Sequence, residues 1–307
     1  MVNCYALISG YVYYGRKYRF TPLVQICLQT LLYSVTIAVC AWILKPELFF
    51  VRSMIGFLLP VSMGKYWYVS AYAGLFVLIP FLNGGINSLS EEKAKVYMGL
   101  LFCVFTVIPT LARHDTFLAN SGYSTFWLAY LYVIGACLKK YGWGAEMQPG
   151  KAVGMYICCV LLSWGIKMGC EGITAYLLGE PKTGFSFIAY TSPTMVAAAV
   201  FLFFAFKNCS VPPKMIGWIS SVSPAAFGVY LIHEHEYISG HFIADRFTGL
   251  AQFSTPVMII CVLGAAATIF GGCLLIDWIR HKLFTWLHVK EALERLENKY
   301  IHYNISV

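Results

Sequence analysis

The sequence predicts an all-α fold, a polytopic transmembrane helix bundle, on three observations. Hydrophobic residues make up 59% of the 307 residues and charged residues only 12%, against about 25% charged residues in soluble domains. The mean hydropathy is +0.68, and apolar runs recur from one end of the chain to the other. A bilayer core of about 30 Å takes a helix of about 20 apolar residues, so these runs leave little chain for a soluble domain.

Nine apolar runs are the expected spans. The first is too short to cross an untilted bilayer core, because a helix rises only about 1.5 Å per residue. We expect helices over residues 2–14, 23–44, 66–82, 96–112, 123–138, 152–179, 190–206, 216–233 and 255–278.

The distribution of basic residues predicts how these spans are oriented. Cytoplasmic loops of membrane proteins carry the excess of Lys and Arg. Of the 22 basic residues, 15 fall in the tail and in alternate loops that begin with the one after the first run, and 6 fall in the other loops. The bias predicts an N-terminus outside the cell and a C-terminus in the cytoplasm.

The chain changes character after residue 278. Apolar residues from Ile279 onward recur at helical spacing with charges between them, which is typical of an amphipathic helix. We therefore expect a transmembrane domain over residues 1–278 and a cytoplasmic amphipathic tail over residues 279–307.

Charge and cysteine content exclude two other classes of protein. The net charge is +8, but the basic residues are spread through short loops, so the expected partner is the lipid bilayer and not nucleic acid. Most of the 11 cysteines lie inside apolar runs, where packing residues are expected and a disulfide framework is not.

Arg16 and Arg19 lie where the first run meets the predicted cytoplasm. On a helical end their i, i+3 spacing would present both guanidinium groups to the same side. Such a pair can bind phosphate, because each guanidinium donates paired hydrogen bonds to anionic oxygens. The alternative is that the two charges only anchor the topology.

The stretch HEHEY, residues 233–237, places His233 and Glu234 at the outer end of the eighth run. Histidine can deprotonate a hydroxyl near neutral pH, and a carboxylate can orient the imidazole. The alternative is a polar cap at the membrane surface. We expect no metal site, because His233 and His235 are two residues apart and no ligand set of structural spacing accompanies them.

Two further groups are candidates for contacting a polar substrate. Lys167 and Glu171 are four residues apart inside the sixth run, where charged residues line a cavity or pair with each other. Trp67 and Tyr68 belong to an aromatic cluster at one outer boundary. They either stack against a sugar or form part of an interfacial aromatic belt.

Four stretches together carry a resemblance to a known family. LISGYVYYGRKYR (7–19) resembles the Ser-Gly-Phe/Tyr segment followed by Arg-x-x-Arg of acyltransferase family 3, the integral membrane acyltransferases that O-acetylate bacterial surface polysaccharides. KYWYVSAYAGLFVLIPFLN (65–83), FWLAYLYVIGACLKKY (126–141) and AFGVYLIHEHEYI (226–238) resemble later segments of that family in the same order.

The resemblance implies an O-acyltransferase of the bacterial cytoplasmic membrane. Such an enzyme binds no resident cofactor and takes an acetyl group from acetyl-CoA, its donor co-substrate, to a hydroxyl of a polysaccharide or lipid-linked glycan. By the same resemblance, Ser9, Gly10, Arg16 and Arg19 would contact the coenzyme.

The chain departs from the family pattern at its beginning. Family members usually start with one more span that carries an arginine and, eleven residues later, a catalytic histidine; here Met1 precedes the shortened first run. We therefore expect an N-terminally truncated chain, with His233 in the site for the acceptor or as a replacement base. The alternatives are a transporter of polysaccharides or lipid-linked sugars, and an inactive remnant of the acyltransferase.

Overall fold

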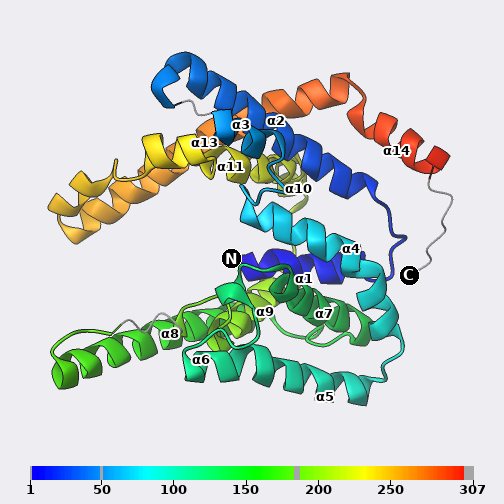
Figure 1. Cartoon of the computed structure of the whole chain (residues 1–307). Helices are drawn as coiled ribbons and strands as arrows, with labels where there is room; N and C mark the ends of the chain where they lie inside the picture. The colour runs from blue at the N-terminus through cyan, green and yellow to red at the C-terminus, as the bar shows by residue number, and fades with distance from the viewer. Residues whose placement is uncertain (1, 49–50, 183–186, 301–307) are drawn as a thin grey trace. The chain divides into compact units, whose positions relative to one another are not determined.

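The computed structural model describes residues 2–48, 51–182 and 187–300, and every regular element among them is a helix (Figure 1). Several helices begin where a serine precedes an apolar run. The side chains of Ser90, Ser124 and Ser192 accept hydrogen bonds from backbone amides three residues on, which satisfies donors that the first helical turn leaves free. The predicted all-α membrane fold is confirmed.

The helices divide into two compact units. The first, which we call unit 1, is built from residues up to Tyr18 and from Ala71–Ser210. Its helices are α1 (Val2–Tyr13), α5 (Glu91–Phe102), α6 (Ile108–Ala112), α7 (Thr125–Tyr141), α8 (Pro149–Leu178) and α9 (Pro193–Lys207).

The second, which we call unit 2, is built from Arg19–Ser70 and from residues 211–300. The helix α4 (Trp67–Asn87) begins in unit 2 and continues in unit 1. The other helices of unit 2 are α2 (Thr21–Leu44), α3 (Val51–Leu58), α10 (Pro213–Val222), α11 (Ala226–His233), α12 (Glu236–Ile238), α13 (Thr255–Trp286) and α14 (Val289–Tyr300).

All nine predicted apolar runs are helical, but they differ in length. Among the described residues, six helical segments are long and apolar enough to cross a membrane: α2, α4, α5 through α6, α8, α10 through α11, and α13. The helices α1, α7 and α9 have only 12, 17 and 15 residues. The protein is therefore a multi-pass membrane protein, while the count of nine spans stays a prediction.

In unit 1, α1 packs directly against α7 through two glycines. A Cβ on Gly10 would lie 2.0 Å from the backbone oxygen of Tyr132, and a Cβ on Gly135 would lie 2.0 Å from that of Leu7. Small residues let the backbones of membrane helices approach closely. The pair of glycines therefore sets the distance between α1 and α7.

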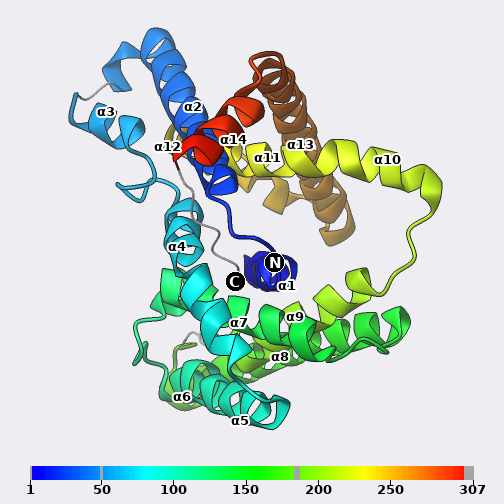
Figure 2. The ribbon, with the colours of Figure 1, turned by 90° about the vertical axis from the view of Figure 1, so that its right-hand side faces the viewer.

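In unit 2, α11 packs against both α2 and α13 (Figure 2). Buried side chains from these helices form its core, with Tyr66 just before α4 and Val69 in the first turn of α4. A Cβ on Gly228 would lie 2.0 Å from the carboxylate of Asp277, so only glycine fits where α11 crosses α13.

The C-terminal part differs from the prediction at its boundary. The helix α13 continues past residue 278 to Trp286, because the apolar residues after 278 keep its helical spacing. The chain then turns at His288, where φ is +49°, and the tail helix is α14. The remaining tail, residues 301–307, lies outside the described residues.

The tail helix α14 docks on the start of α2. The Glu297 carboxylate accepts hydrogen bonds from the backbone amides of Phe20, at 2.6 Å, and Thr21, at 3.3 Å, and from the Thr21 hydroxyl. A negative charge at a helix N-terminus satisfies free amides and is favoured by the helix dipole. The predicted separate tail is therefore part of unit 2.

Candidate functional site

The structure corrects the expected geometry of Arg16 and Arg19. The helix α1 ends at Tyr13, and residues 14–20 are not helical. Gly15 has φ of +75°, a left-handed conformation that commonly ends a helix. Because neither arginine lies on a helix, the predicted shared helical side is wrong. Both side chains are exposed, and their role in binding the coenzyme stays a prediction.

Ser9 and Gly10 lie inside the helix packing of unit 1. The hydroxyl of Ser9 donates to the backbone oxygen of Tyr5 at 2.9 Å and lies 3.4 Å from the hydroxyl of Tyr72. Gly10 is buried against α7. Their contacts give these two residues a packing role, and their predicted contact with the coenzyme remains untested.

A buried polar group lies next to this packing and was not singled out from the sequence. The hydroxyl of Tyr132 donates to Asn83 Oδ1 at 2.9 Å. Asn83 is 1% exposed, and its Nδ2 has no hydrogen-bond partner among the described residues. The signal was present in the sequence, because this asparagine directly follows the apolar run 66–82.

His233, at the C-terminal end of α11, has a defined orientation. Its Nδ1 lies 2.7 Å from the backbone oxygen of Val229. A carbonyl oxygen only accepts, so Nδ1 carries the proton of the neutral ring. The other nitrogen, Nε2, lies 3.5 Å from a carboxylate oxygen of Glu234, and both side chains are partly exposed. Nε2 is therefore the basic nitrogen and can reach a ligand.

Aromatic rings connect His233 to the predicted aromatic residues in unit 2. The ring of Tyr230 lies 6.2 Å from the rings of both His233 and Tyr68. The Tyr68 ring in turn lies 5.5 Å from that of Trp67, at 89°. The structure therefore brings four predicted residues, His233, Glu234, Trp67 and Tyr68, into one cluster, which we call the histidine–aromatic cluster.

The neighbouring His235 is a structural residue. It is 2% exposed, and its ring stacks on that of Phe57 at 5.2 Å. Its Nε2 donates to the backbone oxygen of Ser34 at 3.2 Å, and its Nδ1 accepts from the amide of Tyr237 at 3.2 Å. Both ring nitrogens are occupied, and burial lowers the pKa of His235. His235 therefore stays neutral and holds the loop that follows His233.

Lys167 and Glu171 form the expected ion pair on α8 in unit 1. Their Nζ and Oε2 atoms are 2.8 Å apart, and both side chains are about one-quarter exposed. Pairing lowers the cost of placing charges within an apolar helix. The structure supports an internal salt bridge, and the predicted substrate contact remains untested.

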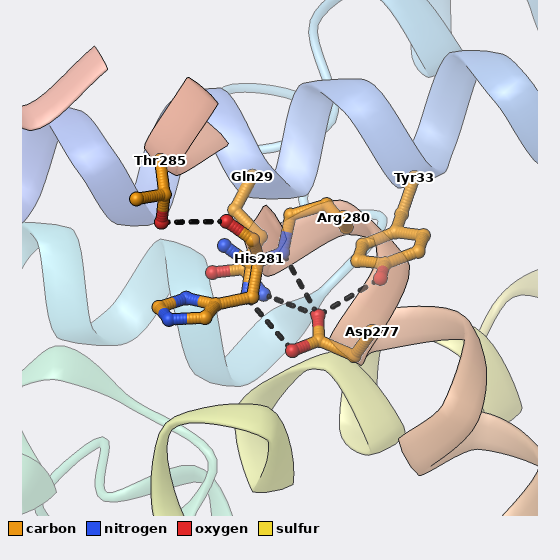
Figure 3. A network of polar contacts seen from close by, with 6 residues as sticks. All are labelled: Gln29, Tyr33, Asp277, Arg280, His281 and Thr285. Carbon is orange, nitrogen blue, oxygen red and sulfur yellow. Dashed lines mark hydrogen bonds and ion pairs between the residues drawn. The ribbon is translucent and has the colours of Figure 1, made fainter. Parts of the chain in front are cut away.

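A buried polar network in unit 2 was missed by sequence reasoning (Figure 3). Asp277 is fully buried. It accepts hydrogen bonds from Gln29 at 3.0 Å, Tyr33 at 2.8 Å, and the Nε and Nη2 atoms of Arg280 at 3.0 and 2.7 Å. Since all these donors point at one carboxylate, the network joins α2 to α13. The i, i+3 spacing of Asp277 and Arg280 could have revealed the ion pair.

No group of three or more His, Cys, Asp or Glu residues that could hold a metal ion occurs in the part of the chain that the structure describes. All 11 cysteines are free thiols.

Comparison with known proteins identifies the family. The sequence profile of acyltransferase family 3, described as an acyltransferase domain, matches residues 1–277. The chain belongs to this family. No curated protein and no solved structure matches the chain. The match includes all four stretches on which the resemblance rests, so the predicted family is confirmed, and the protein is a membrane acyltransferase.

Proposed function

We propose that this acyltransferase is an O-acetyltransferase of the bacterial cytoplasmic membrane. It takes an acetyl group from acetyl-CoA to a hydroxyl of a cell-surface polysaccharide or a lipid-linked glycan. The observation that carries the proposal is the geometry of His233, whose Nδ1 is held by Val229 at 2.7 Å. That hydrogen bond leaves Nε2 as a base beside aromatic rings.

The proposed chemistry needs a base for the acceptor hydroxyl. The hydroxyl gives its proton to Nε2 of His233 while its oxygen attacks the carbonyl carbon of the thioester. A C–O bond forms, the C–S bond breaks, and the thiolate of coenzyme A leaves and takes the proton from the imidazolium. Glu234, 3.5 Å from Nε2, stabilises the imidazolium between the two proton transfers.

The aromatic rings support a carbohydrate acceptor. The faces of Trp67 and Tyr68 are apolar surfaces on which a sugar ring can stack, and the half-buried side chains of both residues leave part of each ring accessible. Coenzyme A acts as donor co-substrate only. Arg16, Arg19, Ser9 and Gly10 are the proposed donor contacts, and the exposed guanidinium groups of the two arginines favour binding of its phosphates.

The test uses the full chain in lipid nanodiscs, with acetyl-CoA labelled in the acetyl group and a lipid-linked glycan as acceptor. We expect His233→Gln to lower kcat by about 100-fold or more, within the usual contribution of general-base catalysis, with an unchanged KM for acetyl-CoA. The matched control is His281→Gln, which replaces an exposed histidine of α13.

Two outcomes would contradict the proposal. If kcat falls by the same factor in His233→Gln and His281→Gln, His233 is not the base for the acceptor hydroxyl. Transport of the glycan without consumption of acetyl-CoA by the unmodified chain would favour a transporter instead.

A further inference from the structure

Two lysines of unit 1 end above the same aromatic ring. Nζ of Lys139, in the last turn of α7, lies 5.0 Å from the ring centroid of Tyr11. Nζ of Lys207, the last residue of α9, lies 5.6 Å from the same centroid. The two ammonium groups are thus no further apart than the sum of these distances, although 68 positions separate the residues in the sequence.

The packing of three helices holds this arrangement. The helix α1 packs against both α7 and α9, and the ring of Tyr11 lies 5.1 Å from that of Phe203. Tyr11 also packs against the core residues around Leu138. The ring is therefore fixed by its neighbours, and the two lysines converge on a rigid support.

No carboxylate among the described residues neutralises the ammonium groups of Lys139 and Lys207. An ammonium group and a ring face attract each other only weakly at an exposed site, while the two ammonium groups repel each other. Among the described residues, neither Lys139 nor Lys207 forms an ion pair with a carboxylate. An anion bound between them would remove the repulsion.

The adjacent Lys140 shows that lysines in this region can have purely structural partners. Its Nζ donates to the backbone oxygens of Ile86, Asn87 and Leu89 at 2.8, 3.2 and 2.7 Å. These carbonyls lie at the end of α4, where helical partners run out. Within the described part of the chain, Lys139 has no such carbonyl partners, so its side chain does not satisfy a helix end as that of Lys140 does.

Asn208 connects Lys207 to two residues that line a cavity. Nζ of Lys207 donates to Oδ1 of Asn208 at 3.2 Å, and Nδ2 of Asn208 donates to the backbone oxygens of Gly144 and Met147 at 3.2 and 2.8 Å. Gly144 and Met147 line a cavity of about 630 Å³ in the loop between α7 and α8, a size typical of small-molecule sites. Lys151 and Glu146 also line it.

We propose that Lys139 and Lys207 bind phosphate groups of the coenzyme A donor, with the cavity between α7 and α8 receiving the nucleotide. This inference rests on the proposed function. Coenzyme A carries a pyrophosphate and a 3′-phosphate, and lysine binds phosphate as a point charge. Glu146, in the lining of the cavity, would repel phosphate. The phosphate groups are therefore expected beside Lys139 and Lys207. Both lysines lie at helix ends that face loops assigned to the cytoplasm by the charge bias, where the donor is found.

The test measures binding of coenzyme A, 3′-dephospho-coenzyme A and pantetheine to the full chain in nanodiscs of zwitterionic lipid. We expect Lys139→Gln and Lys207→Gln each to raise the Kd for coenzyme A about three- to tenfold, and the double variant to raise it more than about tenfold. Binding of pantetheine, which lacks the nucleotide, should not change. Replacing both lysines by arginine should preserve the affinity for coenzyme A.

The matched control is Lys214→Gln, which removes an exposed lysine from α10 in unit 2 on the same predicted side of the membrane. The inference is overturned if the double glutamine variant binds coenzyme A as tightly as the unmodified chain. If that variant also transfers acetyl groups, the proposed function survives alone.

Two further results would also count against the site. If the unmodified chain neither binds coenzyme A nor transfers acetyl groups, the inference and the proposed function fail together. If the double variant keeps its affinity for coenzyme A but loses thermal stabilisation by anionic phospholipid, the lysines bind lipid phosphate instead of the donor.

Discussion

At the residue scale, two histidines two positions apart have opposite roles. In His233, Nδ1 has a backbone partner at 2.7 Å, and Nε2 lies 3.5 Å from the partly exposed carboxylate of Glu234. His235 has partners at both ring nitrogens and is almost fully buried. The identity of the residues does not distinguish them. The turn between α11 and α12 does, because it leaves the His233 ring partly exposed beside Tyr230 and buries the His235 ring against Phe57.

The burial of His235 predicts how stability depends on pH. Burial lowers the pKa of His235, with partial compensation from the Ser34 carbonyl and Glu236. The unfolded chain therefore binds the proton more readily than the folded chain. The stability that the neutral ring contributes is complete above the unfolded pKa of about 6.5, and it is lost as the pH falls toward the lower folded value.

We expect the Tm of the unmodified chain to fall between pH 7.5 and pH 5.5, measured by thermal unfolding in nanodiscs. His235→Phe should unfold at a lower temperature at pH 7.5, because the Ser34 carbonyl and the Tyr237 amide lose their partner, at a cost of about 1–3 kcal/mol. It should also show a weaker dependence on pH. An equal pH dependence in His235→Phe and the unmodified chain would show that other groups cause the effect.

At the scale of elements, glycines decide where helices touch. Gly10 and Gly135 let α1 and α7 approach, and Gly228 lets α11 approach Asp277 on α13. Other helical glycines, such as Gly165 in the lipid-compatible helix α8, have nothing within 4 Å of an added Cβ. Glycine is therefore required where two helices touch, as at Gly135, and replaceable where an added Cβ meets nothing, as at Gly165.

Gly135→Ala should destabilise unit 1, because its Cβ would meet a backbone oxygen of α1 at 2.0 Å. Backbone cannot move as a flexible side chain can, so we expect a loss of more than about 2 kcal/mol in the free energy of unfolding. Gly165→Ala is the control. It should be neutral or stabilising by up to about 1 kcal/mol, and unfolding in denaturant measures both. Equal stability of the two variants would exclude close packing of α1 on α7.

At the scale of the whole molecule, each unit is assembled from distant parts of the chain. Unit 1 joins the first helix to residues 71–210, and unit 2 joins residues 19–70 to residues 211–300. The tail helix α14 belongs to unit 2 through Glu297. The helix α14 is therefore a structural part of unit 2.

The charge bias predicts the orientation of the whole molecule in the membrane. In a background without reactive native cysteines, Ser62→Cys should react with an impermeant thiol reagent in intact cells, and Asn298→Cys should react only after the membrane is permeabilised. Both positions are exposed. Labelling of Asn298→Cys in intact cells would reverse the predicted orientation.

The sequence by itself determined the class of the protein. Composition and apolar runs were sufficient for an all-helical membrane protein, because burial in lipid requires long apolar helices whose backbone groups are satisfied internally. Four short stretches were sufficient for the family. The i, i+4 spacing of Lys167 and Glu171 was sufficient for their ion pair, since such a contact depends on one helix alone.

Only the tertiary structure decided what depends on contacts between distant segments. In the structure, α1 ends before Arg16 and α13 continues past residue 278. It placed Gln29 and Tyr33 around Asp277, and it brought Lys139 and Lys207 to one ring. The physical reason is that local spacing defines which residues share a face of one helix. Which faces meet depends on the packing of helices that are far apart in the sequence.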